Sequence, residues 1–300
     1  MEFERWRLSN CDRLERMEPQ SVLSLCFKKD QLNSVAFVNN DTSVAVGLEK
    51  GQINLVPIKP GDQQQRLRGH TAGITGIAYH PATRTIASAS LDGTIRLWNE
   101  GTSTVIRFDL GPIFRFVTDQ NLSYGVIGTQ KGAALISLDT ESILTNLTSI
   151  KPTAVAISPE GNSCAATISD EACRVFDTRL YRTIVECEVR SKITALALTA
   201  MGDNLVIGCV DGSVVLFDCR QNEIALTKVM QEGMVTSLAI HPSRNILITG
   251  SDDASVTIGN MRNLTASFTV TTHHAPVTSI AISSSGEFFS TIGEDRRLSV

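Results

Sequence analysis

Seven copies of one sequence pattern, spaced 37 to 42 residues apart, run through this chain of 300 residues. The core of each copy is a triplet in which a small residue, usually alanine, stands between two apolar residues. The regular triplets begin at Val35, Ile77, Val155, Leu196, Leu238 and Ile280. The third copy is irregular, because its triplet is interpreted as Phe114-Arg115-Phe116. A repeat of this length, made of short strands and turns, is typical of one blade of a β-propeller.

The repeats extend from one end of the chain to the other, whereas length alone would suggest two domains. We therefore expect an all-β fold, in which residues 21–300 form a single seven-bladed propeller. In residues 1–20, arginines are interleaved with acidic residues, which is typical neither of a signal peptide nor of a transit peptide. This segment is expected to form an N-terminal arm or a short helix.

The two ends of the chain are expected to meet in one blade. The last repeat reaches only its third strand at Leu298-Ser299-Val300. An alternating segment at about 21–27 precedes the first triplet and indicates a β-strand. We expect this N-terminal strand to pair with the C-terminal repeat as its fourth strand. Such pairing closes the ring and removes exposed sheet edges, which otherwise invite aggregation.

The composition argues against several classes of partner. The formal net charge is -4, so the excess of basic charge that electrostatic binding to nucleic acid or anionic membranes requires is absent. No apolar stretch approaches the ~20 residues of a membrane span. Seven cysteines are scattered without a Cys-x-x-Cys pair, which is typical of reduced thiols. We expect no direct nucleic-acid or membrane partner, and a cytoplasmic or nuclear location, or both.

The second copy carries the most complete set of polar residues. His70 precedes its triplet, Asp92 marks its tight turn, and Trp98 ends the following strand. A histidine in this loop can hydrogen-bond the turn aspartate, a strand serine and the indole N–H, and so connect three strands. We therefore predict a structural network at this place. Its expected members are His70, Asp92, Trp98 and either Ser88 or Ser90.

These residues resemble a repeat of the WD-repeat (WD40) family, whose repeats open near Gly-His and end in Trp-Asp. Two further copies end in Phe176-Asp177 and Phe217-Asp218, and the remaining endings depart further from that pattern. The resemblance implies a seven-bladed WD40 propeller that acts as a non-catalytic scaffold for protein–protein interaction. It also implies one subunit of a multiprotein complex, with the propeller itself monomeric.

Part of the chain also resembles a narrower group, the WD-repeat subunits of the superkiller complex. The likeness rests on four segments, at residues 87–98, 108–112, 127–132 and 293–297. It implies an adaptor in an exosome-cofactor complex of messenger RNA decay. Two alternatives stay open: a scaffold of another assembly, in ribosome biogenesis, cilia or centrosomes, and, more distantly, a propeller enzyme.

No motif in the sequence points to catalysis or to a cofactor. Of the five histidines, His80 and His241 lie in His-Pro turns, and His273-His274 is the one adjacent pair, at the place where the last repeat would carry its Gly-His. Neither a phosphate-binding G-x-x-x-x-G-K-[ST] loop, nor G-x-S-x-G, nor a metal-ligand spacing occurs. The aspartates recur with the period of the repeat, which indicates turn structure. We therefore expect no catalytic residue, no metal, no cofactor and no enzymatic activity.

In propellers of the WD-repeat family, the loops that enter the innermost strands and the turns between the second and third strands lie on one face, which usually binds partners. We call it the loop face. On it, Glu49, Asp252 and Glu294 are predicted to form an acidic arc across neighbouring blades, opposite Lys151 and Lys192. The predicted partner-binding residues are Glu49, Leu91, Met234, Asp252, Pro276 and Glu294.

The acidic arc and its apolar neighbours indicate the kind of partner. We expect another protein that presents a peptide with a basic residue and an apolar anchor. The alternative is that these residues are polar only because turns are polar.

Overall fold

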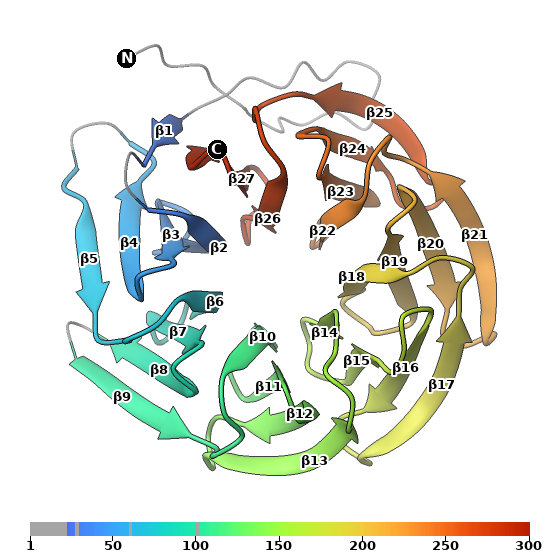
Figure 1. Ribbon diagram of the computed structural model, residues 1–300, viewed down its shortest axis with the longest axis horizontal. Coiled ribbons are helices and arrows are strands. Elements are labelled where there is room, and N and C mark those ends of the chain that lie inside the picture. Colours follow the sequence, from blue (N-terminus) through green and yellow to red (C-terminus); the bar gives the residue numbers. More distant parts are fainter. Residues whose placement is uncertain (1–22, 28–29, 60–61, 100–101) are drawn as a thin grey trace.

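The computed structural model describes residues 23–27, 30–59, 62–99 and 102–300. Seven four-stranded antiparallel sheets are arranged as blades around a common axis (Figure 1). The described residues form strands and turns only, and they contain no helix that could cross a membrane. The expected all-β, seven-bladed propeller is confirmed.

The blades follow one another in chain order, and in each blade the strands run from the axis outward. Blade 1 contains β2 (Leu32–Val38), β3 (Ser43–Leu48), β4 (Gln52–Pro57) and β5 (Gln65–Arg68). Blade 2 contains β6 (Ile74–His80), β7 (Thr85–Ser90), β8 (Thr94–Asn99) and β9 (Thr102–Arg107). Blade 3 contains β10 (Ile113–Thr118), β11 (Tyr124–Thr129), β12 (Gly132–Ser137) and β13 (Ser142–Thr148).

The second half of the ring repeats this order. Blade 4 contains β14 (Val155–Ile157), β15 (Ser163–Thr167), β16 (Ala172–Asp177) and β17 (Arg182–Glu188). Blade 5 contains β18 (Ile193–Leu198), β19 (Asn204–Cys209), β20 (Ser213–Asp218) and β21 (Glu223–Val229). Blade 6 contains β22 (Val235–Ile240), β23 (Ile246–Ser251), β24 (Val256–Asn260) and β25 (Thr265–Val270). Blade 7 contains β26 (Val277–Ile282), β27 (Phe289–Gly293), β28 (Arg297–Ser299) and β1 (Ser24–Cys26).

The regular triplets lie in the innermost strands, where the blades converge. Their central alanine has a small cross-strand partner in several blades, since Ala78 pairs with Ala87 and Ala156 pairs with Ala165. Small side chains at this radius let neighbouring sheets approach closely. The packing near the axis therefore explains why the middle of the triplet is small.

The register of blade 3 corrects the third triplet. Phe116 occupies the position that Ile77 has in blade 2, so the triplet is Phe116-Val117-Thr118, two residues later than predicted. Arg115 lies one position earlier and pairs with Gly128, which leaves room for the long side chain. The two phenylalanines that flank Arg115 have the same spacing as the two apolar residues of a triplet. For this reason the sequence pattern places the third triplet two residues too early.

The ring is closed by the two ends of the described chain. β1 pairs with β28 in antiparallel register, with Leu25 opposite Leu298. The pairing continues beyond the strands, because the backbones of Leu23 and Val300 exchange hydrogen bonds of 3.2 and 2.9 Å. The predicted closing strand at about 21–27 is thus observed as β1 over Ser24–Cys26. The arm predicted for residues 1–20 lies outside the described residues.

Asp41 reinforces the contact between the first and last blades. It lies in the turn between β2 and β3, with a φ of 63° that Asp tolerates better than most residues. Its carboxylate accepts hydrogen bonds from the backbone N–H groups of Ser284 and Ser285 in blade 7, at 3.0 and 2.8 Å. The Ser284 hydroxyl donates to the same carboxylate at 3.0 Å. One side chain of blade 1 therefore holds the inner turn of blade 7.

A row of threonine hydroxyls joins neighbouring blades near the axis. Each donates to the carbonyl of the first residue of the next innermost strand. The donors are Thr153, Thr194, Thr236 and Thr278, and their acceptors are Ile193, Val235, Val277 and Leu32, respectively. The bond from Thr278 to Leu32, at 3.3 Å, crosses the seam between blades 7 and 1. The closing blade is therefore held by the same kind of contact as the blades before it.

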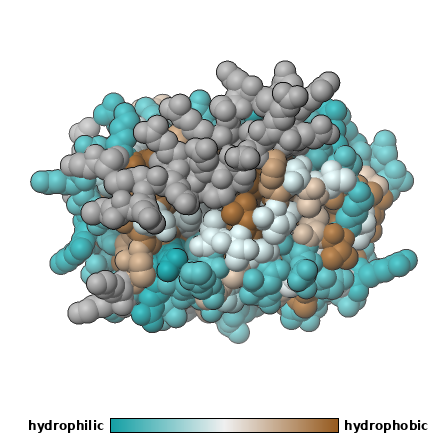
Figure 2. All heavy atoms as spheres, turned by 90° about the horizontal axis from the view of Figure 1, so that it is seen from above, coloured by the Kyte–Doolittle hydropathy of each residue, from teal (hydrophilic) through white to brown (hydrophobic). Residues whose placement is uncertain are grey.

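Apolar clusters fill the spaces between adjacent blades. The cluster at the seam includes Val35 and Leu48 of blade 1 and Ile292 and Leu298 of blade 7, with half-buried Leu25 packed against it. Five of the six cysteines in the described part of the chain are buried, and all six are free thiols. On the side of the disc seen in Figure 2, hydrophilic side chains cover most of the described surface and hydrophobic ones form small groups.

Candidate partner-binding site

The structure brings His70, Ser88, Asp92 and Trp98 together in blade 2. His70 Nδ1 lies 2.9 Å from Asp92 Oδ2, and His70 Nε2 lies 2.9 Å from Ser88 Oγ. The Trp98 Nε1–H donates to the same Ser88 oxygen at 2.8 Å. Ser90, the alternative serine, instead donates to a backbone carbonyl of the loop before β6. One chain of hydrogen bonds thus ties this loop to β7 and β8.

Atom types fix the direction of each hydrogen bond in this network. A carboxylate only accepts, so His70 Nδ1 carries the hydrogen and donates to Asp92. Nε2 of the neutral ring then accepts from the Ser88 hydroxyl, whose oxygen accepts from the indole. Thr94 donates to Asp92 Oδ1 at 2.6 Å and lies 3.1 Å from His70 Nδ1. Sequence reasoning missed Thr94, whose one signal is its place directly after the turn.

Blade 7 builds a related network at the equivalent loop. His273 Nδ1 lies 3.0 Å from Asp295 Oδ1, and His273 Nε2 lies 2.9 Å from Thr291 Oγ1. The Asp295 carboxylate also accepts from the backbone N–H of His274 at 3.0 Å. The turn and the loop of blade 7 are therefore joined in the same way as those of blade 2.

Blade 6 replaces both aromatic members of the network. Gln231 takes the place of the histidine, and its Nε2 donates to Thr249 Oγ1 at 2.7 Å. Gly259 takes the place of the tryptophan, and the buried Met230 brings its Cε to 2.7 Å from where a Cβ would stand at Gly259. A flexible thioether suits such an irregular space. Sequence reasoning missed both residues, because neither carries a motif of its own.

The network sets the charge states of His70 and Asp92. Burial lowers the pKa of His70 and outweighs the Asp92 hydrogen bond and charge, which raise it. Burial by itself would raise the pKa of Asp92, but hydrogen bonds from Thr94, Thr71 and His70 outweigh it and lower that pKa to about 2. At neutral pH a neutral imidazole therefore faces an ionised carboxylate.

The protein is expected to lose stability as the pH falls below about 6.5, the usual pKa of histidine. In this range the unfolded chain binds a proton on His70 while the folded chain keeps the ring neutral, so acid favours unfolding. His241, whose pKa burial also lowers, acts in the same direction. Asp92 adds a further loss between its usual pKa of 3.8 and about 2. Urea unfolding across this pH range measures the effect.

A His70→Gln variant is the matched control for this pH dependence. Glutamine occupies the equivalent place in blade 6 and does not titrate. The free energy of unfolding of the variant should vary less between about pH 6.5 and pH 5 than that of the unmodified chain. An unchanged slope would show that His70 is not the source of the acid sensitivity.

Backbone hydrogen bonds pair four of the six predicted partner-binding residues on the loop face. In blade 6 the amide of Asp252 donates to the carbonyl of Met234 at 3.1 Å. In blade 7 the amide of Glu294 donates to the carbonyl of Pro276 at 2.9 Å. Each bond ties the turn between the second and third strands to the loop that enters the innermost strand. An acidic and an apolar predicted residue therefore lie side by side in two neighbouring blades.

Glu49 and Leu91 hold the same position in blades 1 and 2. The amide of Glu49 donates to the carbonyl of Gln31 at 3.1 Å, and the amide of Leu91 donates to that of Gly73 at 2.9 Å. Both residues thus lie on the loop face. Each is hydrogen-bonded to a residue that is not among the predicted partner-binding residues. Leu91 is 37% exposed, which is high for a leucine.

The exposed groups of this face include both carboxylates and cations, since Lys50 follows Glu49 and Arg296 lies two residues after Glu294. Glu49, Asp252 and Glu294 are exposed, whereas Met234 and Pro276 are half-buried. Lys192, on the opposite half, lies 3.0 Å from Asp170 in an ion pair, and Lys151 Nζ lies 4.1 Å from the centre of the Phe114 ring. Both lysines therefore have partners while they stay exposed on this face.

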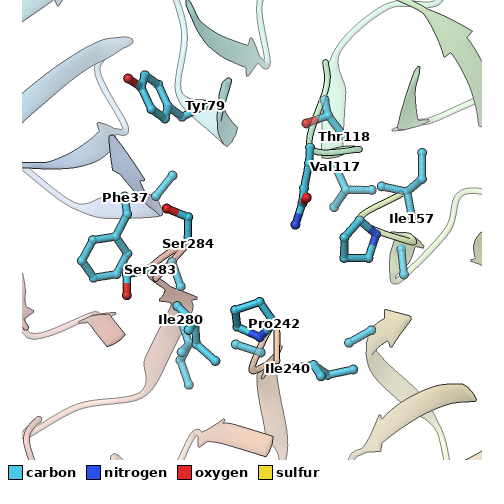
Figure 3. A pocket seen from close by; sticks show the side chains of 18 of the residues that line it. Phe37, Tyr79, Val117, Thr118, Ile157, Ile240, Pro242, Ile280, Ser283 and Ser284 are labelled. Carbon is cyan, nitrogen blue, oxygen red and sulfur yellow. The ribbon is translucent and has the colours of Figure 1, made fainter. Parts of the chain in front are cut away.

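A cavity of about 570 Å³ opens on the other face of the ring, at the ends of the innermost strands (Figure 3). Most of its wall is apolar and comes from all seven blades. The labelled apolar side chains in Figure 3 are Phe37, Val117, Ile157, Ile240, Pro242 and Ile280, and Tyr79 adds an aromatic ring with its hydroxyl. Asp41 is its one charged residue within the described chain, and that carboxylate is bound by blade 7. The cavity thus offers shape and apolar contact rather than acid–base chemistry.

Within the ranges that the structure describes, no three His, Cys, Asp or Glu side chains come together as a metal site would require. The ionised Asp92 and the neutral His70 are buried partners of each other, and both serve the contact between loop and strands.

Comparison with known proteins agrees with the repeat pattern. The family model described as WD domain, G-beta repeat matches residues 61–99, 226–258 and 264–300. The mouse (Mus musculus) WD repeat and HMG-box DNA-binding protein 1 is 35% identical over 72 residues, which cover 24% of this chain and 6% of that protein. The Xenopus laevis protein of the same name is 24% identical over 204 residues, or 67% of this chain and 15% of that protein.

A further relative is the WD repeat-containing protein 91 homolog of Dictyostelium discoideum. It is 26% identical over 187 residues, which cover 58% of this chain and 24% of that protein. The matched part of this chain therefore spans at most about a quarter of the length of these relatives. None of the three supports the narrower resemblance to superkiller subunits.

The comparisons and the architecture point to the same class of protein. WD-repeat propellers are typically non-enzymatic scaffolds, and they generally mediate protein–protein interactions. Seven four-stranded blades, three segments that match the repeat model and several WD-repeat relatives agree with one another. The chain is a seven-bladed β-propeller, and three of its segments match the WD-repeat family model.

Proposed function

We propose that this chain is a non-catalytic scaffold subunit that binds another protein through its loop face. The observation that carries the proposal is the pairing of exposed Asp252 with half-buried Met234, and of exposed Glu294 with half-buried Pro276, in adjacent blades. A peptide with a basic residue and an apolar neighbour fits this alternation of charge and apolar surface. Glu49 in blade 1 extends the acidic arc across the seam.

The two kinds of contact contribute differently to binding. Exposed ion pairs contribute about 0.2–1 kcal/mol each, so the acidic arc mainly steers and orients a basic peptide. Burial of an apolar anchor against Met234 and Pro276 supplies the larger share of the affinity. The partner is therefore expected to need both features in one short segment.

Charge reversal of the acidic arc tests this function. The Glu49→Lys, Asp252→Lys, Glu294→Lys triple variant should fold with a near-unchanged thermal midpoint, because all three side chains are exposed. Proteins that co-purify with the unmodified chain, identified by quantitative mass spectrometry, should be lost from this variant. The matched control reverses three exposed glutamates on the other face, at Glu160, Glu223 and Glu287. Equal recovery of the partner with both folded variants would rule out the acidic arc as the docking surface.

The identity of the assembly is a separate part of the proposal. The superkiller resemblance makes a cytoplasmic messenger RNA decay complex one candidate, with a nuclear complex, ribosome biogenesis and ciliary or centrosomal assemblies as the others. Co-purification of a helicase and a tetratricopeptide scaffold would support the first candidate. We propose that the propeller itself is monomeric in such a complex.

A further inference from the structure

A recess of about 590 Å³ opens at the loop-face end of blade 6. It lies between the end of β21 and the strands β24 and β25, and we call it the blade 6 recess. Its wall includes Gln231, Glu232, Asp253, Ser255, Thr257 and Thr269. Asp253 directly follows Asp252 in the chain, so the recess adjoins the acidic arc.

The orientation of the Gln231 amide is fixed by its neighbours. Its Nε2 lies 3.0 Å from the backbone carbonyl of Thr249, which can only accept, so the amino group must face that strand. The amide oxygen therefore faces the opposite way, towards the hydroxyls of Ser255 and Thr257. Gln231 is 4% exposed, so water has little access to its amide and does not replace these hydrogen-bond partners.

The hydroxyl hydrogens of the recess are directed inward. Ser255 Oγ and Thr257 Oγ1 lie 2.9 and 3.1 Å from Gln231 Oε1. Because an amide oxygen has no hydrogen, Thr257 donates its single hydroxyl hydrogen to it, and the Ser255 hydrogen is directed to this oxygen or to the Asp253 carboxylate. Thr269 Oγ1 lies 3.1 Å from Thr257 Oγ1 and must in turn donate to that oxygen. Thr257 is fully buried, so a ligand can reach Ser255 and Thr269, whose oxygens offer it lone pairs.

Two carboxylates complete this wall of acceptors. Asp253 accepts from the amides of Ser255 and Gly233, at 2.8 and 3.2 Å. Partial burial raises the pKa of Asp253, but hydrogen bonds from Ser255, Gly233 and Ser251 outweigh it and hold the pKa below its usual value. Asp253 is therefore ionised at neutral pH, and each of its oxygens has a second acceptor position. Glu232, which also lines the recess, is exposed.

We propose that the blade 6 recess binds the guanidinium group of an arginine in a partner peptide. A guanidinium carries five N–H donors, no acceptor and a permanent positive charge. The Asp253 and Glu232 carboxylates and the lone pairs of Ser255 and Thr269 match such a group, and the two negative charges favour it over a neutral amide. This inference rests on the proposed scaffold function and deepens it, because it assigns the basic residue of the partner peptide to the blade 6 recess.

The neighbouring residues extend the fit to the rest of the peptide. Met234 lies in the same loop as Gln231 and is half-buried on the loop face. An apolar residue next to the arginine can therefore pack on Met234 while the guanidinium enters the recess. The partner motif is an arginine with an adjacent apolar side chain.

A titration with small arginine compounds tests the recess directly. N-acetyl-arginine methylamide is added to the full chain labelled with 13C at its methionine methyl groups, because Met230 lines the recess and its methyl group, packed against Gly259, reports on it. The Met230 signal should shift saturably with arginine. N-acetyl-citrulline methylamide, which has the same shape and no charge, should leave it unchanged. An equal response to citrulline or to the lysine analogue, or no response to arginine, overturns the proposal.

Three single variants locate the binding charge. Glu232→Gln and Asp253→Asn should each weaken arginine binding about fivefold. Glu223→Gln is the matched control, since this exposed carboxylate lies on the other face and outside the wall of the recess. A loss with Glu223→Gln as large as that with Asp253→Asn would overturn the assignment to the recess. If Asp253→Asn fails to fold, the exposed Glu232→Gln still decides the question.

The two proposals fail in different ways. If charge reversal of the acidic arc releases the partner but arginine does not shift Met230, the recess assignment is wrong and the scaffold function stands. If arginine binds the recess but charge reversal leaves the partner in place, the recess stands as an arginine site and the arc does not carry the function.

Discussion

Replacement of Trp98 by alanine is expected to lower the free energy of unfolding by about 3–5 kcal/mol. Trp98 is 7% exposed and belongs to the cluster that fills the space between blades 1 and 2, with Ile53, Ile74 and Ile86. Alanine leaves a large cavity there and also removes the indole donor to Ser88. Denaturant unfolding measures the change in midpoint and slope.

A Trp98→Phe variant separates packing from hydrogen bonding. Phenylalanine keeps most of the apolar volume and lacks the N–H, so its cost should stay near 1–2 kcal/mol, about that of one buried hydrogen bond with some repacking. Equal losses in the alanine and phenylalanine variants would mean that the network, rather than the filled space, gives Trp98 its effect. A loss below about 1 kcal/mol in Trp98→Ala would contradict its place as a core residue.

Leu298→Ala is expected to cost about 2–5 kcal/mol and to open blade 7 selectively. Leu298 is fully buried in the seam cluster and pairs with Leu25 of β1. No turn of the chain joins β28 to β1, so once this packing is lost the outer strand can separate without unfolding a hairpin. Amide hydrogen exchange should therefore speed up in β1 and β28 before it does in other blades.

Ile95→Ala supplies the matched comparison for the seam. Ile95 is also fully buried and holds the equivalent position in blade 2, whose strands are joined by short connections. A similar loss of stability is expected, without selective exchange in blade 7. If both variants show the same exchange pattern, the seam between blades 7 and 1 is no weaker than the other blade contacts.

The fold was largely predictable because strand and turn signals are local and recur seven times. Alternating apolar residues and turn residues define each four-stranded unit, and β1 was found because one outer strand was missing from the last copy. Blade 3 shows the limit of this reasoning. Phe114-Arg115-Phe116 has the apolar spacing of a triplet but lies in a different register. The pairing of Arg115 with Gly128 fixes that register, and only the three-dimensional structure shows this pairing.

The polar contacts were predictable only where a residue type reveals its role. His70 and Trp98 stand out in a sequence. In blade 6 Gln231 makes the hydrogen bond that corresponds to that of His70, and Met230 packs where the tryptophan side chain would lie, but neither residue type reveals this. Asp41 had no signal for its role, since its partners Ser284 and Ser285 lie in the last blade. The blade 6 recess depends on such unmarked residues, and a family motif does not reveal it.

The mutual hydrogen bonds of Leu23 and Val300 have a mechanical consequence. These two residues lie at the same end of the β1–β28 ladder, so tension applied between them breaks its hydrogen bonds one after another, as in a zipper. Tension applied along the strands of an antiparallel pair would have to break several bonds at once. Load carried across these two residues therefore opens blade 7 first, while the threonine hydroxyls and Asp41 still hold its innermost strand and inner turn to blade 1.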